Sequence, residues 1–324
     1  IGNQCLVEND WECAISYFEQ AASANPEELE KAGVGYLDIL KTLAAVYFYA
    51  GRDADANAIV DSLKTEGEDD ARLYFSLGKA MNFLERYEEA VAYYRTGFDK
   101  GVDDINEEFI IRAYSGYAAA LVNAGEGDEA LRVVREDSVP HITDDATRKE
   151  LEASIYMELK RYEDAISIYE WLSSSDPENR SYLFSLSLAC DLGGRLSDAE
   201  KALLTILDKD PEDALALNNL SYMYLEHDMN LKKALEMVQQ ALINEPHNGA
   251  YLDTLAWAYY KLDKYKDARK YIERALKWAK DDDIGVIYEH HGDILLKLGD
   301  PTRAADAYRK AIESGEDESR IGPK

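Results

Sequence analysis

The sequence predicts an all-α fold in which pairs of antiparallel helices stack along the chain as a solenoid. Three observations lead to this prediction. Apolar residues recur at helical spacing, so that they form one face of each helix. Only 7 prolines and 19 glycines interrupt the 324 residues, which leaves room for long helices. An alanine recurs with a period near 34 residues, the length of two helices with their turns.

The recurring alanine marks the second helix of each pair. It stands at Ala90, Ala130, Ala165, Ala199, Ala234, Ala268 and Ala304, with spacings of 40, 35, 34, 35, 34 and 36 residues. A small residue at this point lets two helices approach closely, and large residues around it fill the seam between neighbours. Because a single pair cannot bury this surface alone, we expect successive pairs to pack on one another.

This register divides residues 29–318 into eight repeats, with half a repeat before them at 1–28 and a disordered tail after them at 319–324. Extra residues at 29–36 are expected to lengthen a helix, and 105–110 form a further insertion. Since residue 1 falls inside a helical pattern, we expect the chain to be a fragment of a longer protein. The eight repeats cover 37–70, 71–104, 111–144, 146–179, 180–213, 214–248, 249–282 and 285–318.

The repeats resemble the tetratricopeptide repeat (TPR) family. Residues 249–282 show its pattern of large, small and aromatic positions most fully, with Leu252, Leu255, Ala256, Tyr259, Tyr265, Ala268, Ile272 and Ala275. Prolines stand where the family ends its second helix, at Pro26, Pro177, Pro211 and Pro246, and proline stops a helix because it lacks an N–H. The resemblance implies a right-handed superhelix that binds other proteins.

Residues 214–312 also resemble a bacterial subgroup that includes envelope TPR lipoproteins, some of which are scaffolds or adaptors for periplasmic proteases. This resemblance implies an envelope adaptor, placed in the bacterial periplasm. Two alternatives stay open: a cytoplasmic scaffold that assembles a complex through its convex face and ends, and a TPR domain of a larger enzyme. The partner, the compartment, the oligomeric state and any domain before residue 1 are not decided by the sequence.

The composition restricts the partners to proteins or peptides. The chain has 64 acidic and 36 basic residues, a net charge of −28, which repels phosphate backbones and anionic membrane surfaces. No apolar run approaches the roughly 20 residues that span a bilayer. We therefore expect no nucleic acid and no membrane insertion within this chain, although an anchor before residue 1 is compatible with the sequence.

No motif for catalysis, metal or cofactor binding is present. HExxH and CxxC are absent, and the adjacent His290 and His291 would point about 100° apart on a helix. The acidic run at 281–283 lacks the spacing of a calcium loop. Cys5 and Cys13 lie on neighbouring predicted helices and their pairing stays open, while Cys190 is expected in the core. The sequence thus predicts a protein that is not an enzyme.

One stripe of each first helix lines the concave face in TPR proteins, on the side away from the packed seam. Much of this stripe is apolar in the fifth to seventh repeats, and exposed apolar patches usually mark binding sites. We expect a partner segment here, with Asn218 and Asp253 holding its backbone, unless curvature or a C-terminal tail covers the stripe. The predicted groove residues are Phe184, Leu188, Asn218, Tyr222, Leu225, Asp253, Trp257 and Tyr260.

A second patch is predicted near the N-terminus, where the stripe is more basic than the rest of the chain. Its residues are Phe48, Tyr49, Arg72, Phe75, Lys79 and Phe83. An acidic peptide is the partner that this patch would favour.

Overall fold

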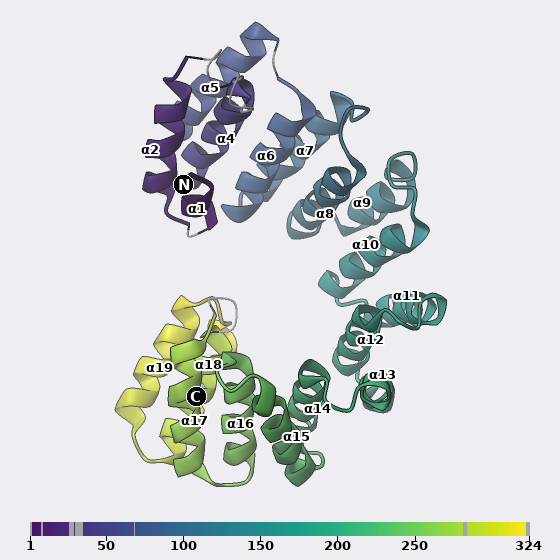
Figure 1. Cartoon of the computed structure of the whole chain (residues 1–324), viewed down its shortest axis with the longest axis vertical. Coiled ribbons are helices and arrows are strands. Elements are labelled where there is room, and N and C mark those ends of the chain that lie inside the picture. Colours follow the sequence, from purple (N-terminus) through teal and green to yellow (C-terminus); the bar gives the residue numbers. More distant parts are fainter. Residues whose placement is uncertain are drawn as a thin grey trace. The chain divides into compact units, whose positions relative to one another are not determined.

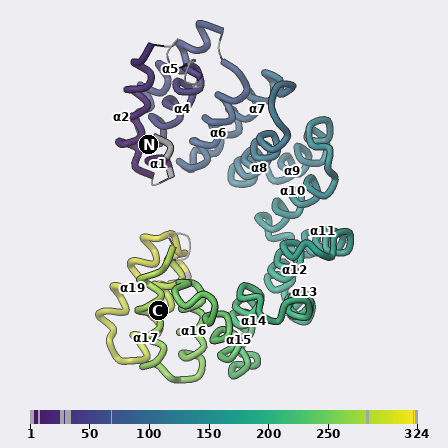
Figure 2. Tube along the Cα trace, in the orientation of Figure 1, coloured from purple at the N-terminus to yellow at the C-terminus, as the bar shows by residue number. Residues whose placement is uncertain are grey.

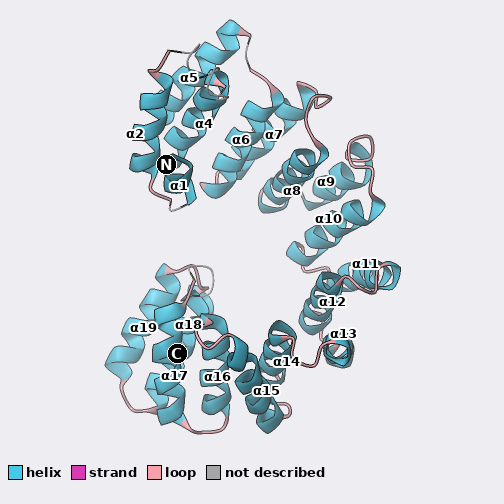
Figure 3. Cartoon of the chain, viewed as in Figure 1, coloured by secondary structure: helices cyan, strands magenta, loops and turns pink. Residues whose placement is uncertain are grey.

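The chain was analysed as a computed structural model, which describes residues 2–7, 9–25, 29, 35–67, 69–280 and 284–321. Throughout this part of the chain the structure is helical and contains no strand, as Figure 3 shows. The predicted all-α fold is therefore confirmed. Ile1, Pro26, the middle of the segment 29–36 and the acidic run at 281–283 lie outside the described residues.

The chain divides into two compact units, residues 1–168 and 169–324. In Figures 1 and 2 the helices of the first unit follow one another as antiparallel neighbours. They are α1 (Gly2–Val7), α2 (Trp11–Ala22), α4 (Tyr36–Tyr49), α5 (Asp53–Glu66), α6 (Ala71–Phe83), α7 (Tyr87–Asp99), α8 (Glu107–Asn123), α9 (Gly127–Arg132), the π-helical turn η1 (Val133–Asp137) and α10 (Asp145–Glu158).

The second unit continues the same alternation, after α11 (Tyr162–Ser175), which crosses the division between the units. Its helices are α12 (Arg180–Leu192), α13 (Leu196–Lys209), α14 (Ala214–Glu226), α15 (Leu231–Asn244), α16 (Gly249–Lys261), α17 (Tyr265–Trp278), α18 (Ile284–Lys297), α19 (Pro301–Glu313) and α20 (Glu318–Ile321). Two successive helices overlap each of the eight predicted repeat ranges, although α8 begins at Glu107, before the range 111–144, and the boundaries drawn between the repeats stay a prediction.

Local sequence signals set where these helices begin. Asp213 caps α14, because its Oδ1 accepts a hydrogen bond from the backbone N–H of Ala216 at 3.0 Å. Asn248 caps α16 in the same way, accepting from the N–H of Tyr251 at 3.2 Å. Such side chains satisfy amides that have no partner within the helix.

Most turns inside a pair place one residue in the left-handed region, and the turn between α14 and α15 places two there, Asp228 and Asn230. Glycine fills that position at Gly194, with φ of +77°, and accepts it without strain. Glu85, Lys160 and Asp263 fill it in other pairs, with φ of +57°, +57° and +60°. The turn geometry is therefore kept even where the residue type does not favour it.

The alanines that define the period are the tightest points of the core. All of them, from Ala90 to Ala304, are 0% exposed. Glycine plays the same part in α6, where a Cβ on Gly78 would lie 2.8 Å from the ring of Tyr94. The alanine period, which predicts close packing of the helices, therefore coincides with positions that are fully buried.

Two segments differ from the expectation. The insertion expected at 105–110 contributes its last residues to α8, which begins at Glu107 after the cap Asn106. The tail expected to be disordered contains α20, and Ile321 is buried against a cluster that includes Leu295 and Tyr308.

Candidate functional site

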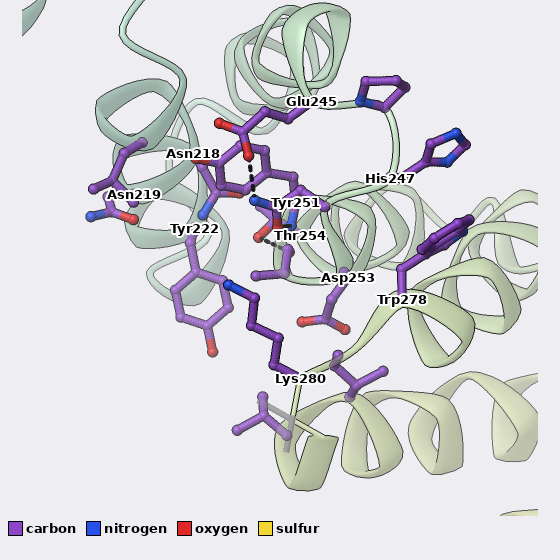
Figure 4. Close-up of a pocket in the computed structure, with 17 residues that line it drawn as sticks. Asn218, Asn219, Tyr222, Glu245, His247, Tyr251, Asp253, Thr254, Trp278 and Lys280 are labelled. Carbon is purple, nitrogen blue, oxygen red and sulfur yellow. Dashed lines mark hydrogen bonds between the residues drawn. The ribbon is translucent and has the colours of Figure 1, made fainter. Parts of the chain in front are cut away.

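A cavity of about 820 Å³ opens between α14, α16 and α18, and Figure 4 shows its lining. The connections that precede α16 and α18 form its rim. Its lining residues are Leu215, Asn218, Asn219, Tyr222, Glu245, Pro246, His247, Asn248, Gly249, Ala250, Tyr251, Asp253, Thr254, Trp278, Lys280, Val286 and Ile287. All of them belong to the second unit.

A smaller cavity of about 320 Å³ lies between α12 and α14. Asn219 and Tyr222 line both cavities, so α14 forms the ridge that separates them. The other residues of the smaller cavity are Phe184, Ser185, Ser187, Leu188, Asp191, Leu203 and Met223. The two cavities together are called the α14 groove below.

Asn218 is the polar residue of the groove that most needs a partner. The side chain lines the larger cavity, the residue is only 8% exposed, and its Oδ1 has no hydrogen-bond partner among the described residues. A buried acceptor without a partner costs roughly 1–3 kcal/mol. An N–H donor of a bound molecule would recover this cost.

Asp253 also lines the larger cavity and is already paired. Its two carboxylate oxygens lie 2.9 and 3.0 Å from Nδ1 of His290, which projects from α18. Burial alone would lower the pKa of His290, but the charge and the hydrogen bond of Asp253 outweigh it and raise this pKa above its ordinary value. The pair holds α16 and α18 together beneath the groove.

Trp257 does not lie in the open groove, and the prediction that it does was wrong. The residue is 8% exposed, and its ring stacks between Tyr260 at 4.5 Å and His290 at 4.1 Å. Its Nε1–H donates to Oε1 of Glu226 at 2.7 Å. A ring that is covered on both faces and bonded at its edge is a packing residue, because no face remains for a partner.

The prediction that Leu225 lines the open groove was also wrong, because this residue of α14 is fully buried. Tyr260 is half-buried against Trp257 and lines neither cavity. The structure does bring Phe184, Leu188 and Tyr222 together along the groove, and Leu188 is 54% exposed. Their part in binding stays a prediction.

Sequence reasoning missed the rim of the larger cavity. Trp278, the last residue of α17, is 51% exposed and stacks at 4.5 Å on His247, which lies in the connection before α16. Lys280 follows Trp278, lines the cavity and makes no ion pair with another described residue; Figure 4 shows its side chain extending toward the cavity. Neither residue belongs to the stripe of a first helix, so the stripe rule could not find them.

Gly249 explains how the connection after α17 comes so close to α16. A Cβ at this position would lie 2.7 Å from the carbonyl oxygen of Trp278 and 2.8 Å from the backbone of Ala279. The missing side chain thus allows the end of α17 and the connection that carries Lys280 to close one end of the cavity.

The predicted N-terminal patch is only partly a surface. Phe48 and Phe75 are buried core residues, because α4 and α6 are covered on both sides by neighbouring helices, and placing them in a patch was wrong. Arg72 and Lys79 are exposed, and Arg72 donates to the carbonyl oxygen of Asp104 at 2.9 Å.

Tyr49 and Phe83 form a cluster with Trp11, which the sequence reasoning did not include. Their rings lie 4.7 Å (Trp11–Tyr49), 5.6 Å (Trp11–Phe83) and 5.1 Å (Tyr49–Phe83) apart. Trp11 stands between Cys5 and Cys13, which form a disulfide in this structure. Cys190 is a free, buried thiol.

Within the described ranges, no group of three or more histidine, cysteine or acidic side chains is arranged to hold a metal ion. The helices there are likewise too short or too polar to cross a bilayer.

Comparison with known proteins finds similarity to proteins with the same kind of repeat. Tetratricopeptide repeat models match residues 151–214 and 193–251, 228–284, and 71–99 and 286–315. The TPR repeat-containing protein YpiA of Bacillus subtilis is 24% identical over 288 residues, which are 84% of this chain and 62% of that protein. A TPR repeat-containing protein of Pseudomonas aeruginosa is 29% identical over 108 residues, 33% of this chain and 18% of that protein.

The chain therefore spans less than two thirds of the length of these relatives. A crystal structure of a tetratricopeptide repeat protein from Parabacteroides merdae matches with a TM-score of 0.59 at 18% identity, over 78% of this chain and 96% of that one. TPR proteins generally mediate protein–protein interactions and act as non-enzymatic scaffolds. With its repeats, its all-α fold and these matches, the chain belongs to the tetratricopeptide repeat family.

Proposed function

We propose that this chain is a non-catalytic scaffold that binds a segment of a partner protein in the α14 groove. The observation that carries the proposal is the α14 groove itself, whose wall is open to solvent at Leu188, 54% exposed, and whose lining includes Asn218 with a buried Oδ1 that has no partner among the described residues. A polypeptide backbone offers an N–H at every residue except proline, so it is a ready donor for such an acceptor.

The surroundings of Asn218 support a protein ligand. Tyr222 and Leu188 give the groove an apolar wall that is open to solvent, and exposed apolar surface of this kind marks interaction sites. Two acidic groups of the groove have histidine partners, since Asp253 pairs with His290 and Asp191 with His227 at 2.7 Å, while Glu245 accepts a hydrogen bond from Nδ2 of Asn248 at 2.8 Å. The groove therefore offers hydrogen bonding and apolar contact to a partner, with an affinity on the order of 1 μM, about −8 kcal/mol.

The test is a quantitative pull-down from the source cell with wild type and Asn218→Leu, followed by affinity measurement with each purified partner. Leucine matches asparagine in size and removes the unpaired acceptor, so the fold should be as stable as wild type or more stable. Partner binding should nevertheless weaken about tenfold, because the partner loses a hydrogen bond and meets an apolar group.

Asn244→Leu is the matched control, because this amide is exposed at the end of α15 and lines neither cavity. It should leave every partner bound. If Asn218→Leu keeps its stability and retains all partners with unchanged affinity, the α14 groove is not the binding site and the scaffold acts through another surface.

We further propose that the protein works in an oxidising compartment, in keeping with the resemblance to envelope TPR adaptors. The disulfide between Cys5 and Cys13 supports this, since structural disulfides persist outside the reducing cytosol. Rapid acid quenching of source cells and alkylation of free thiols would test it. One labelled cysteine per chain, Cys190, is expected after denaturation. Labelling of all three would instead favour the cytoplasmic scaffold.

A further inference from the structure

We infer that the outward side of α17 binds a short acidic segment of a partner protein. This surface is separate from the α14 groove, and its role does not depend on the proposed function. Four basic residues form it, Lys266, Lys270, Arg274 and Lys277, and they are called the basic face of α17 below. None of them makes an ion pair with another described residue, and a cavity opens beside Arg274.

The charge of α17 is opposite to that of the chain as a whole. The protein has a net charge of −28, whereas α17 has five basic and two acidic residues. Second helices earlier in the chain are acidic: α5 has four acidic residues and one basic residue, and α11 has three acidic residues and no basic one. Because salt at about 0.15 M screens distant charges beyond about 8 Å, a local positive surface can still attract an anion.

Helical spacing places the basic face on the solvent side of α17. Its four residues follow one another at intervals of four, four and three, so they share one side of the helix. The opposite side holds Ala268, Ile272 and Ala275, which are fully buried in one cluster with residues of α16 and α18. The three lysines are exposed and Arg274 is half-buried. A ligand on this face therefore leaves the first helices and their groove free.

Nearby carboxylates neutralise only part of this charge. Oε1 of Glu273 is engaged elsewhere, since it lies 2.8 Å from Nε of Arg269 and 3.8 Å from Nη2 of Arg303 on α19. Asp267 on α17 and Glu236 on α15 are exposed and lie toward the beginnings of their helices. The acidic run at 281–283 lies outside the described residues. The surplus of positive charge is therefore greatest in the second half of α17.

Tyr271 holds two cations of the basic face against the protein. Nζ of Lys270 and Cζ of Arg274 each lie 5.4 Å from the centroid of its ring, which stacks on Tyr259 at 5.4 Å. Nη2 of Arg274 also donates to the carbonyl oxygen of Pro246 at 3.4 Å. Cations that are already held in this way lose less conformational entropy when a carboxylate binds than free side chains do. The basic face is thus preorganised for an anion.

A cavity of about 200 Å³ lies between α15 and α17, and Arg274 belongs to its lining. The exposed Pro246 and the half-buried Leu242 and Tyr271 form part of its wall. Exposed ion pairs contribute only about 0–1 kcal/mol each, so the cations alone give weak binding. Burial of one leucine-sized side chain adds roughly 1.5–3 kcal/mol. The segment that fits best therefore has one apolar side chain among its acidic ones.

The length of the basic face favours a protein segment over larger polyanions. Lys266 and Lys277 are eleven residues apart on one helix, a distance of about 16 Å. About five residues of an extended chain cover this distance. A nucleic acid or an anionic membrane extends far beyond it and meets the acidic remainder of the protein, whose net charge is −28.

The test is selection of peptides from a random phage-displayed library on wild type, after depletion of the library on the double variant Lys270→Glu, Lys277→Glu. Depletion removes peptides that bind other surfaces, including the α14 groove. Enriched peptides are labelled and measured by fluorescence anisotropy. We expect acidic sequences with an apolar residue, and their affinity should fall about tenfold or more with the double variant. Replacing that apolar residue by serine should have a similar effect.

The double variant Lys201→Glu, Lys297→Glu is the matched control. Lys201 is the sixth residue of α13, as Lys270 is of α17, and Lys297 lies in the last turn of α18, as Lys277 does in α17. Both control lysines are exposed, and the net charge changes by the same amount. The control should bind the peptides as wild type does. Salt gives a second readout, because binding to wild type should weaken in about 1 M salt, where the screening length is about 3 Å.

Three outcomes would overturn the assignment of this face. The first is enrichment of peptides without acidic residues, or equal affinity of the two double variants. The second is tighter binding of a single-stranded oligonucleotide or of phosphatidylserine vesicles to the basic face than of any enriched peptide. The third is self-association of wild type in sedimentation that the Lys270→Glu, Lys277→Glu variant loses, which would assign the face to a second copy of this chain. The α14 groove is tested separately by Asn218→Leu and is untouched by these results.

Discussion

The substitution Trp257→Ala separates a packing role from a binding role for this tryptophan. Its ring is covered by Tyr260 on one face and by His290 on the other, and its Nε1–H is bonded to Glu226. Truncating a buried tryptophan to alanine costs about 3–5 kcal/mol, through lost burial and the cavity left behind. Truncating an aromatic side chain that is exposed in a groove would instead lower the free energy of unfolding by less than about 1 kcal/mol.

The assay is urea denaturation followed by far-ultraviolet circular dichroism, fitted with a nearest-neighbour model because stacked repeats unfold in steps. Trp257→Phe is an intermediate variant, which keeps an aromatic ring in the stack and should lose roughly 0.5–1.5 kcal/mol with the hydrogen bond. Trp278→Ala is the matched control, since this tryptophan is half exposed at the groove rim. Equal, small losses for Trp257→Ala and Trp278→Ala would refute the buried stack.

Two further predictions concern the same unit. The pKa of His290 is raised, so the stabilising ion pair with Asp253 is fully present below about pH 6.5, the ordinary histidine value, and is lost as the pH rises through the raised pKa. The melting temperature of wild type should therefore fall as the pH rises above about 6.5, whereas the melting temperature of His290→Gln should change less with pH. Parallel curves for the two proteins would contradict the pair. Ala268→Leu overfills a fully buried helix crossing and should cost about 1–3 kcal/mol by the same urea assay, whereas Lys270→Leu on the exposed face of α17 should change stability little. A stable Ala268→Leu would show that this alanine is not at a tight crossing.

The helices could be predicted from sequence because their signals are local and repeated. The alanine at each crossing, such as Ala199 or Ala268, carries the period, and capping residues such as Asp213 mark where a helix begins. These features depend on neighbours a few residues away. The fold class therefore followed from spacing alone.

The candidate site could be predicted only for residues whose exposure follows from their position in the stripe of a first helix. Leu188 and Tyr222 follow that rule and line the groove. Trp257 departs from it because His290, on the next first helix, happens to be an aromatic partner of the right size. Trp278 ends α17 and Lys280 lies in the connection after it, and both were missed because the path of this connection depends on the close approach at Gly249 and has no periodic signal.

The rim of the larger cavity also affects how the ligand preference of such a protein can change during evolution. The groove floor belongs to helices whose buried residues hold the stack together, so substitutions there disturb stability. His247 and Lys280 belong to connections and Trp278 is the exposed last residue of α17, and at such places replacements are tolerated with little cost to the fold. Ligand preference can therefore drift by exchange of these few side chains while the repeats stay intact, and one scaffold can acquire new partners without being rebuilt.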